Sequence, residues 1–275
     1  MKWLLFLAAV TSAAFAGSPA RIVSVGGAAT ETVFALGSGA AVVGVDTSSV
    51  YPEKVTSLPQ VGYQRMLSAE GIASLKPDLV ILAATAGPPA AVEQLEKLGI
   101  PLLRLQEGYN IESTVARIQQ IGKALDRVSR AEEICRKIEA DAAAIAAPRH
   151  PSQRVLFVMS AGGGAPMVAG TGTAADAAIR LSGGANAGAD FSGYKQLSSE
   201  ALVALDPEVV VTTSRTMKAA ASGELLPGLS LTTAGKNGRM IVMDDLYLLG
   251  FGPRTGEALA EFSKKLAGYR LSAGR

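Results

Sequence analysis

Tyrosine and glutamate, rather than histidine or cysteine, occupy the positions in this sequence that could support chemistry. The 275 residues contain one histidine, His150, and one cysteine, Cys135. Zinc sites require several imidazole or thiolate ligands, and nucleophilic triads require a base beside the nucleophile, so the composition argues against both. A single cysteine also excludes an internal disulfide bond. Two tyrosines, Tyr63 and Tyr194, each follow a glycine and precede one copy of an internal repeat.

The repeat relates residues 67–80 to residues 197–210, which lie 130 positions later. In each copy a serine, Ser68 or Ser198, stands where a helix N-cap is expected, and apolar residues follow at helical spacing. A proline then ends the helix, and a run rich in apolar and β-branched residues comes next. Each half of the chain therefore contributes a helix, a turn and a buried strand in the same order.

Segments typical of strands and helices alternate around both copies of the repeat. They are 21–25, 31–36, 90–98 and 101–105 in the first half, and 154–159, 174–181, 240–243 and 255–267 in the second. Such alternation predicts an α/β fold in which parallel sheets are covered by helices. We predict two Rossmann-like lobes, residues 17–110 and residues 154–275.

Residues 111–153 are expected to join the lobes as a helical linker and a connector. The stretch 111–147 is charged and amphipathic, contains no proline and carries apolar residues at helical spacing. Two ordinary helices meeting near Ser129 fit this pattern, and so does one long helix. The connector 148–153 contains His150 between prolines, which suits an exposed segment better than a metal site.

The beginning of the chain predicts export. Lys2 is followed by an apolar stretch, residues 4–10, and by the small-residue triplet 14–16. This is the pattern of a signal peptide, here residues 1–16, cleaved after Ala16. The alternative, a membrane anchor, would need roughly 20 apolar residues. No cysteine follows the cleavage point, so we expect an exported protein without a lipid anchor.

Two α/β lobes that face each other form a cleft at the carboxyl ends of their strands, where ligands of such folds bind. Tyr63 and Tyr194 belong to the loops before the repeat helices and could both face this cleft. The residues alone therefore indicate a binding cleft with tyrosines and leave its ligand open. The almost balanced charge of the exported chain gives no indication of nucleic-acid binding.

A resemblance to a known family narrows the function. The opening strand Arg21–Ser24, the helix start Thr30–Thr32, the run Leu75–Val80 and the helical linker resemble the helical-backbone class of periplasmic binding proteins. The resemblance covers the chain from residue 17 on. It implies a periplasmic location, a cargo such as haem, a ferric siderophore or cobalamin, and membrane permease subunits of an ABC importer as partners.

The run Val61–Arg65 is similar to the motif of the haem-binding members, and so is Gly252–Thr255. This similarity implies that Tyr63 is an axial ligand of the haem iron and that Arg65 supports it. A tyrosine binds iron as the phenolate, and a nearby positive charge lowers its ordinary pKa near 10. The alternative for Tyr63 is an amphipathic packing residue.

The second iron ligand found in some relatives is a histidine of the second lobe. Such a histidine is missing here, because His150 lies in the connector. We therefore expect ferric haem held by one tyrosinate and five-coordinate. How many haems the cleft holds stays open.

Haem has two propionates and an apolar macrocycle, so its cleft needs cations and apolar walls. Candidate cations are Lys195, Arg215 and Arg254, and candidate walls are Met66, Met167 and Tyr194. Each has an ordinary alternative: solvated surface charges for Lys195 and Arg215, a cap or salt bridge of the last helix for Arg254, and core packing for the methionines.

Glu70 and Glu200 occupy equivalent positions in the two copies of the repeat. In the resembled class such glutamates dock onto arginines of the importer. A glutamate in the first turn of a helix is also favourable by itself, which is the alternative.

We predict a monomeric haem-binding transport protein and not an enzyme. The same fold carrying a ferric siderophore or cobalamin is the first alternative, and an exported α/β enzyme is the second. The run Gly170–Ala175 matches G-x-G-x-x-A, but the loop that follows its helix does not fit a dinucleotide-binding βαβ unit.

Overall fold

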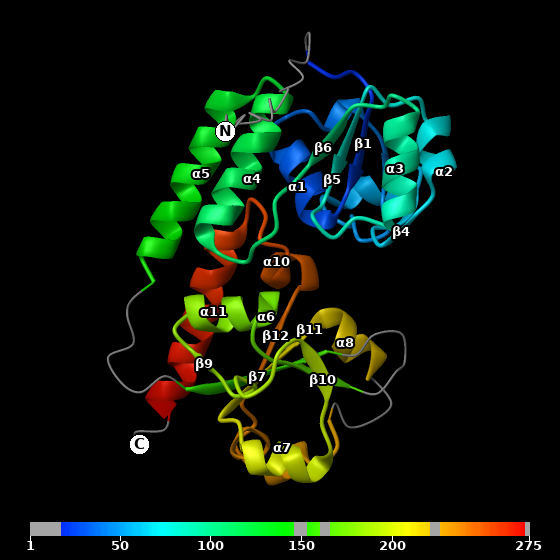
Figure 1. Cartoon of the computed structure of the whole chain (residues 1–275). Helices are drawn as coiled ribbons and strands as arrows, with labels where there is room; N and C mark the ends of the chain where they lie inside the picture. The colour runs from blue at the N-terminus through cyan, green and yellow to red at the C-terminus, as the bar shows by residue number, and fades with distance from the viewer. Residues whose placement is uncertain (1–17, 146–152, 160–165, 221–225, 273–275) are drawn as a thin grey trace, which may run out of the picture.

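The computed structural model describes residues 18–145, 153–159, 166–220 and 226–272, which form two α/β lobes arranged end to end (Figure 1). The predicted signal peptide, residues 1–16, lies outside the described residues, and so does His150. No helix in the described part of the chain is long and apolar enough to cross a membrane.

The first lobe contains a parallel sheet of four strands in the order β2-β1-β5-β6. Its strands are β1 (Ile22–Val25), β2 (Val42–Val45), β5 (Leu79–Leu82) and β6 (Leu102–Arg104). Its helices are α1 (Gly27–Ala35), α2 (Ala69–Ser74) and α3 (Pro89–Lys97), with 3₁₀ turns η1 (Gly39–Ala41) and η2 (Glu53–Ser57). A separate hairpin consists of β3 (Gly62–Tyr63) and β4 (Met66–Leu67).

Apolar side chains on both faces of this sheet explain why helices cover it on both sides. Successive residues of a strand point to opposite faces. Ile22 and Ile81 accordingly lie in one core with α1, while Val23 and Val80 lie in a second core with α2 and α3. Strands buried on both faces are typical of parallel α/β sheets.

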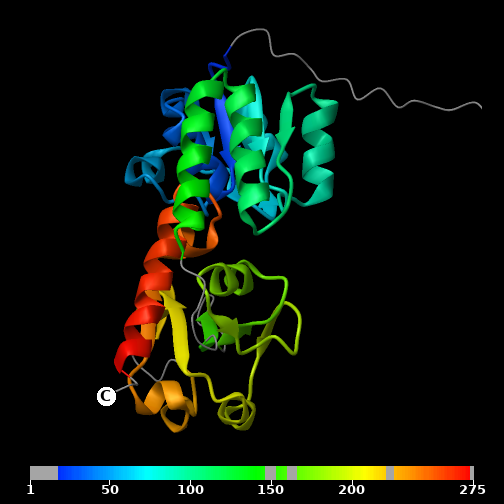
Figure 2. The ribbon, with the colours of Figure 1, turned by 90° about the vertical axis from the view of Figure 1, so that its left-hand side faces the viewer.

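Residues 111–143 form two helices, α4 (Ile111–Ala124) and α5 (Val128–Ala143), so the two-helix alternative is correct. Asn110 caps α4 through a capping box with Ser113, and the chain reverses at Asp126, whose φ is 53°. Both helices pack against the first lobe, and α5 also contacts the last helix, α11 (Thr255–Ser272). Figure 2 shows the pair beside the first lobe with α11 below it.

The second lobe contains a mixed sheet in the order β10-β8-β7-β11-β12, with β9 on β7. Strand β7 pairs in parallel with β9 and β11, and β11 pairs in parallel with β12. Strand β8 pairs antiparallel with both β7 and β10. The strands are β7 (Arg154–Met159), β8 (Met167–Ala169), β9 (Ala185–Asn186), β10 (Tyr194–Gln196), β11 (Val209–Thr213) and β12 (Met240–Met243). The helices are α6 (Ala174–Leu181), α7 (Ser199–Leu205), α8 (Ser214–Ala219), α9 (Thr233–Lys236) and α10 (Asp245–Leu249), with the 3₁₀ turn η3 (Leu229–Leu231).

The predicted repeat is present as α2–β5 in the first lobe and α7–β11 in the second. Ser68 accepts a hydrogen bond from the Gly71 amide at 3.0 Å, and Ser198 accepts one from the Ala201 amide at 3.2 Å. Both predicted N-caps are therefore confirmed. The α/β fold with two lobes and a cleft is also confirmed.

Candidate functional site

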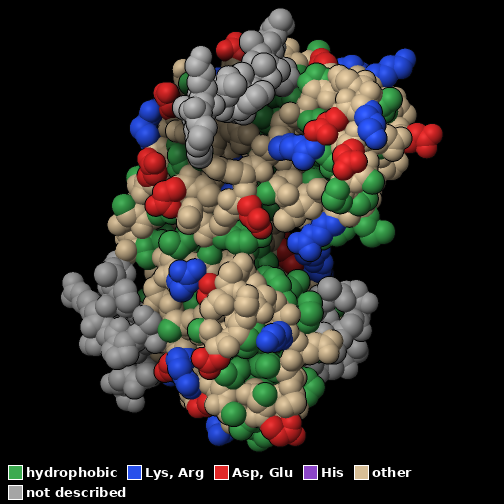
Figure 3. All heavy atoms as spheres, in the orientation of Figure 1, with side chains coloured by type: hydrophobic (Ala, Val, Ile, Leu, Met, Phe, Trp, Pro, Cys, Tyr) green, Lys and Arg blue, Asp and Glu red, His purple; other side chains and the backbone are tan. Residues whose placement is uncertain are grey.

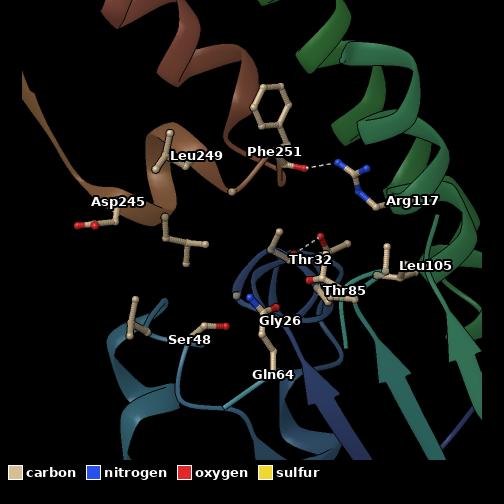
Figure 4. A pocket seen from close by; sticks show the side chains of 18 of the residues that line it. Gly26, Thr32, Ser48, Gln64, Thr85, Leu105, Arg117, Asp245, Leu249 and Phe251 are labelled. Atoms are coloured by element: carbon tan, nitrogen blue, oxygen red, sulfur yellow. Dashed lines mark hydrogen bonds between the residues drawn. The ribbon is translucent and has the colours of Figure 1, made fainter. Parts of the chain in front are cut away.

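A cavity of about 580 Å³ lies between the two lobes, in the size range of cofactor pockets. The first lobe contributes the loops after β1, β2, β5 and β6, and the second contributes the segments after β11 and β12. All of these are carboxyl ends of parallel strands, as the sequence predicted. Figure 4 shows side chains from both lobes converging on this space.

The hairpin β3–β4 brings the predicted tyrosine motif to the rim of the cavity. Gln64 and Arg65, the two residues of its turn, line the cavity, and Tyr63 stands next to them. Gly62 has a φ of 98°, and a Cβ atom there would lie 2.8 Å from the Met66 carbonyl oxygen. The tight turn therefore requires glycine before Tyr63.

Tyr63 is exposed to solvent over 43% of its surface, and Met66 over 75%. The two residues are directly paired across the hairpin, so their side chains share one face. Within the described residues, no group forms a hydrogen bond to the Tyr63 hydroxyl. Tyr63 and Met66 do not line the cavity itself, but they stand at its edge with surface available to a ligand.

The basic side chains of the cavity come from both lobes. Arg65 belongs to the first lobe, and Arg215 and Lys218 come from α8 of the second. Arg215 donates to Asp245 Oδ1 from Nε at 3.1 Å and from Nη2 at 2.8 Å. Lys218 was missed by the sequence analysis, because one lysine in an irregular stretch carries no signal of its own. Figure 3 shows Lys and Arg side chains beside the notch between the lobes.

Arg254 does not line the cavity, so its assignment to a ligand carboxylate needs correction. Its Nε and Nη2 donate to Glu31 Oε1 and Oε2 at 2.7 and 2.9 Å. The guanidinium also lies 3.7 Å from the Tyr51 ring centroid and 5.0 Å from that of Tyr247. Burial lowers the pKa of Arg254, but Glu31 outweighs it, so the pKa lies above its usual value. The expected alternative was a cap or salt bridge of the last helix, whereas the observed salt bridge joins Arg254 to Glu31 of α1 in the other lobe.

Arg117 of α4 and Phe251 form a second connection between the lobes, and both line the cavity. Arg117 donates to the Phe251 carbonyl at 3.1 Å and to the Gly108 carbonyl at 2.8 Å (Figure 4). Burial lowers the pKa of this guanidinium. The Phe251 ring contacts that of Tyr109 at 5.6 Å between centroids. No sequence motif marks these residues, because they meet only through the packing of α4 on the loop before α11.

Tyr194, Lys195 and Met167 of the second lobe are not among the residues that line the cavity, and their assignment as a cation and walls stays a prediction. Tyr194 and Lys195 belong to the edge strand β10, and the Lys195 ammonium lies 5.4 Å from the Phe191 ring centroid. Met167 pairs with Met159 at the end of β7. Tyr194 nevertheless lies near the cavity, because Tyr109 and Arg65, which line it, both influence the pKa of the Tyr194 phenol.

Glu70 and Glu200 are both exposed and lie in the first turns of α2 and α7. The pKa of the Glu200 carboxyl group lies below its usual value, because the Glu200 backbone amide and the Ser198 side chain donate hydrogen bonds to it. Elsewhere among the described residues, no group of three or more His, Cys, Asp and Glu side chains is arranged to hold a metal ion. The cavity rim with Tyr63 is thus the candidate site for a bound ligand.

Comparison with known proteins adds to this geometry. The model of the periplasmic binding protein family matches residues 22–247. The solved structure of the apo form of the periplasmic heme-binding protein RhuT from Roseiflexus sp. RS-1 is 40% identical, with a TM-score of 0.86. The match covers 92% of this chain and 99% of that one. The sequence-based resemblance is therefore confirmed at the level of family and fold.

Two curated relatives are similar over most of their length. The uncharacterized ABC transporter substrate-binding lipoprotein YvrC of Bacillus subtilis is 29% identical, over 90% of this chain and 80% of the relative. A cobalamin-binding protein of Halobacterium salinarum is 30% identical, over 89% of this chain and 69% of the relative. By their names these proteins all bind a solute or substrate, whereas the named ligand differs between heme and cobalamin.

Proposed function

This chain belongs to the periplasmic binding protein family, and on that premise we propose that it binds ferric haem through Tyr63 and delivers it to an ABC importer. The observation that carries the proposal is the hairpin β3–β4. It exposes a tyrosine without a hydrogen-bond partner among the described residues, beside an arginine in the cavity wall. The similar solved structure is that of a heme-binding protein.

The chemistry of the rim suits ferric haem. A phenolate oxygen is a known haem ligand. Arg65 lies in the turn directly after Tyr63 and lines the cavity. The haem propionates need cations in turn, and Arg65, Arg215 and Lys218 line the cavity from both lobes. We assign the propionates to these three side chains, in place of Lys195 and Arg254.

A hemin titration followed by absorption spectroscopy tests the proposal. The protein is expected to give a high-spin ferric tyrosinate spectrum. Tyr63→Phe removes the ligand oxygen and keeps the ring, so hemin affinity should fall by more than about 100-fold, or about 2.8 kcal/mol. Tyr269→Phe is the control: the Tyr269 hydroxyl donates to the Met240 carbonyl outside the cavity wall, so this variant should keep the spectrum. An unchanged spectrum in Tyr63→Phe would rule out Tyr63 as the ligand.

Cobalamin is the second candidate cargo, since the Halobacterium relative is a cobalamin-binding protein. The cavity chemistry favours haem, because the cobalt of cobalamin already has its axial ligands and does not need a phenolate oxygen from the protein. Competition between hemin and cyanocobalamin for the purified protein separates the two. Haem binding is contradicted if cyanocobalamin displaces hemin at equal concentration.

We also propose that Glu70 and Glu200 dock onto the permease subunits, one glutamate from each lobe. Both carboxylates are exposed at helix N-termini and lie outside the cavity wall. Glu70→Ala with Glu200→Ala should therefore leave hemin affinity within about twofold, since distant sites act independently. Transport by the reconstituted importer should fall sharply. Loss of hemin binding itself would show that the pair is not a docking surface.

The export signal remains part of this proposal. Membership of the family implies a location outside the cytoplasm. Cleavage after Ala16 predicts a mature N-terminus at Gly17. Mass spectrometry of the exported protein checks this bond.

A further inference from the structure

Asp46 is a fully buried acidic residue directly after β2, and the proposed iron ligation does not use it. Its Oδ1 accepts hydrogen bonds from the Gly26 amide and the Ser49 hydroxyl, both at 2.7 Å. Its Oδ2 accepts from the Ser48 amide at 2.9 Å and from the Ser48 hydroxyl. All four partners are neutral donors, which suits a carboxylate, because a carboxylate only accepts.

These bonds tie together two loops of the cavity wall. Gly26 belongs to the loop after β1 and Ser48 to the loop after β2, and both line the cavity. Gly26 has a φ of 107°, and a Cβ atom there would lie 2.7 Å from Ala83 Cβ. The loop after β1 therefore passes close to the loop after β5, and Asp46 holds it there.

The loop after β2 also supports the hairpin that carries Tyr63. The Thr47 amide donates to the Gly62 carbonyl at 2.9 Å, one residue before Tyr63. The Val61 amide donates to the Val45 carbonyl at 2.9 Å, one residue before Asp46. The backbone on both sides of Asp46 is thus hydrogen-bonded to the backbone that leads into Tyr63.

Behind Asp46 lies further buried polar structure that makes the carboxylate hard to replace. Ser49 is within 2.8 Å of the Thr30 hydroxyl, which donates to the Ser24 hydroxyl at 2.9 Å. Ser24 and Thr30 are completely buried. A buried polar group without its partner costs free energy, so removal of the central acceptor leaves several donors unsatisfied.

From these contacts we infer that Asp46 is a positioning residue for the cargo site, which sets the place of Tyr63 by fixing the loops after β1 and β2. The inference rests on the proposed role of Tyr63. Asp46 contacts no cargo itself. It acts on the hairpin through Thr47 and Gly62, as residues that hydrogen-bond to the surroundings of a metal ligand commonly do.

A double-mutant cycle on the full chain tests the inference. Asp46→Asn keeps the shape but turns an amide group toward existing donors, and it should weaken hemin affinity about 10- to 100-fold. In the Tyr63→Phe background the same change should weaken the residual affinity less than about threefold, because the group on which it acts is gone. Equal losses in both backgrounds would overturn the inference, since Asp46 would then support the cavity in general.

Asp176→Asn is the matched control. Asp176 is also buried and lies outside the cavity wall; it accepts hydrogen bonds from Asn186 at 3.0 Å and, unlike Asp46, from Arg180 at 3.0 and 3.2 Å. Its substitution should leave the tyrosinate spectrum unchanged. Should Asp46→Asn fail to fold, Ser49→Ala removes one donor and should shift hemin affinity in the same direction by a smaller factor. An unchanged affinity in that folded variant would count against the inference.

Hydrogen exchange separates this inference from the proposed function. If the unaltered protein does not bind hemin, the proposed function fails. Exchange of the Thr47 amide can still be measured without cargo, and it reports whether Asp46 holds the loop after β2 in place. Asp46→Asn should then speed Thr47 exchange by about tenfold or more, which corresponds to about 1.4 kcal/mol of lost protection. Unaltered exchange would show that Asp46 does not hold this loop.

Discussion

The two lobes contain the same repeat, but the tyrosine before the repeat has different surroundings in each lobe. Tyr63 stands in an isolated two-stranded hairpin, and its hydroxyl has no partner among the described residues. Tyr194 stands in β10, which is hydrogen-bonded to the central sheet through β8. Burial raises the pKa of the Tyr194 phenol, while Thr173 and Arg65 oppose the rise.

The repeat therefore provides the same helix and strand scaffold in both lobes, but it does not provide the ligand-binding site. In both lobes it supplies a capped helix, a turn and a parallel strand, because local capping and apolar periodicity dictate these elements. The loops and strands added around it decide which side chains reach the cavity. The first lobe adds a hairpin with Tyr63 and Arg65, and the second adds α8 with Arg215 and Lys218.

Breaking the contact between the lobes should have the largest effect on stability. Arg254→Ala leaves Glu31, whose side chain is only 5% exposed, without its ion-pair partner. The expected loss is about 3 to 5 kcal/mol of unfolding free energy, measured by urea denaturation. We further expect the two lobes to unfold in separate transitions in this variant.

Arg104→Ala is the control for that experiment. Arg104 pairs with Glu96 on the surface, where the two side chains are 59% and 51% exposed. Its removal should change stability by less than about 1 kcal/mol. A similar loss in both variants would show that the Glu31–Arg254 pair does not hold the lobes together.

Alkaline unfolding should distinguish the cores of the two lobes. Burial, followed by the charge of Glu139, raises the pKa of the Cys135 thiol in the first lobe from 9.0 to about 11. The unfolded chain loses this proton first, so the stability present below pH 9 is lost as the pH rises toward 11. The expected loss is about 1 to 2 kcal/mol.

Urea denaturation of Cys135→Ala at pH 8 and pH 11 checks this prediction. The variant should lose less stability between the two pH values than the unaltered protein. Tyr194→Phe removes the corresponding raised pKa in the second lobe and should flatten the profile above pH 10. The assignment to Cys135 fails if its removal leaves the pH profile unchanged.

The smallest expected loss of stability comes from removing the helix N-cap in either copy of the repeat. Ser68→Ala and Ser198→Ala each remove one N-cap hydrogen bond, and each should cost about 1 kcal/mol. Thermal denaturation of both variants measures the costs. Markedly unequal values would mean that the copies are equivalent in sequence pattern but not in energy.

Much of the fold could be predicted from the sequence because its signals are local. The strands 154–159 and 240–243 and the helix 174–181 match the structure residue for residue. The short strands β8 and β10 were not predicted, since three-residue segments have too little periodicity to be recognised.

The residues of the candidate site could likewise be predicted from the sequence only in part. The tyrosine motif could be recognised because Gly62, Tyr63 and Arg65 are adjacent in the chain, and one hairpin presents them together. The role of Arg254 could not, because its partner Glu31 lies 223 residues away in the other lobe. Asp46 likewise belongs to no sequence motif, because its four hydrogen bonds join the loops after β1 and β2, which are distant in the chain.

The sequence by itself determined the α/β class, the two lobes, the two caps of the repeat and the tyrosine motif, since each depends on residues within one or two turns or strands of one another. Only the tertiary structure decided which charged side chains line the cavity and which pair with each other within the protein. The free energy of a charged group depends on its surroundings in space, and residues far apart in the chain provide those surroundings.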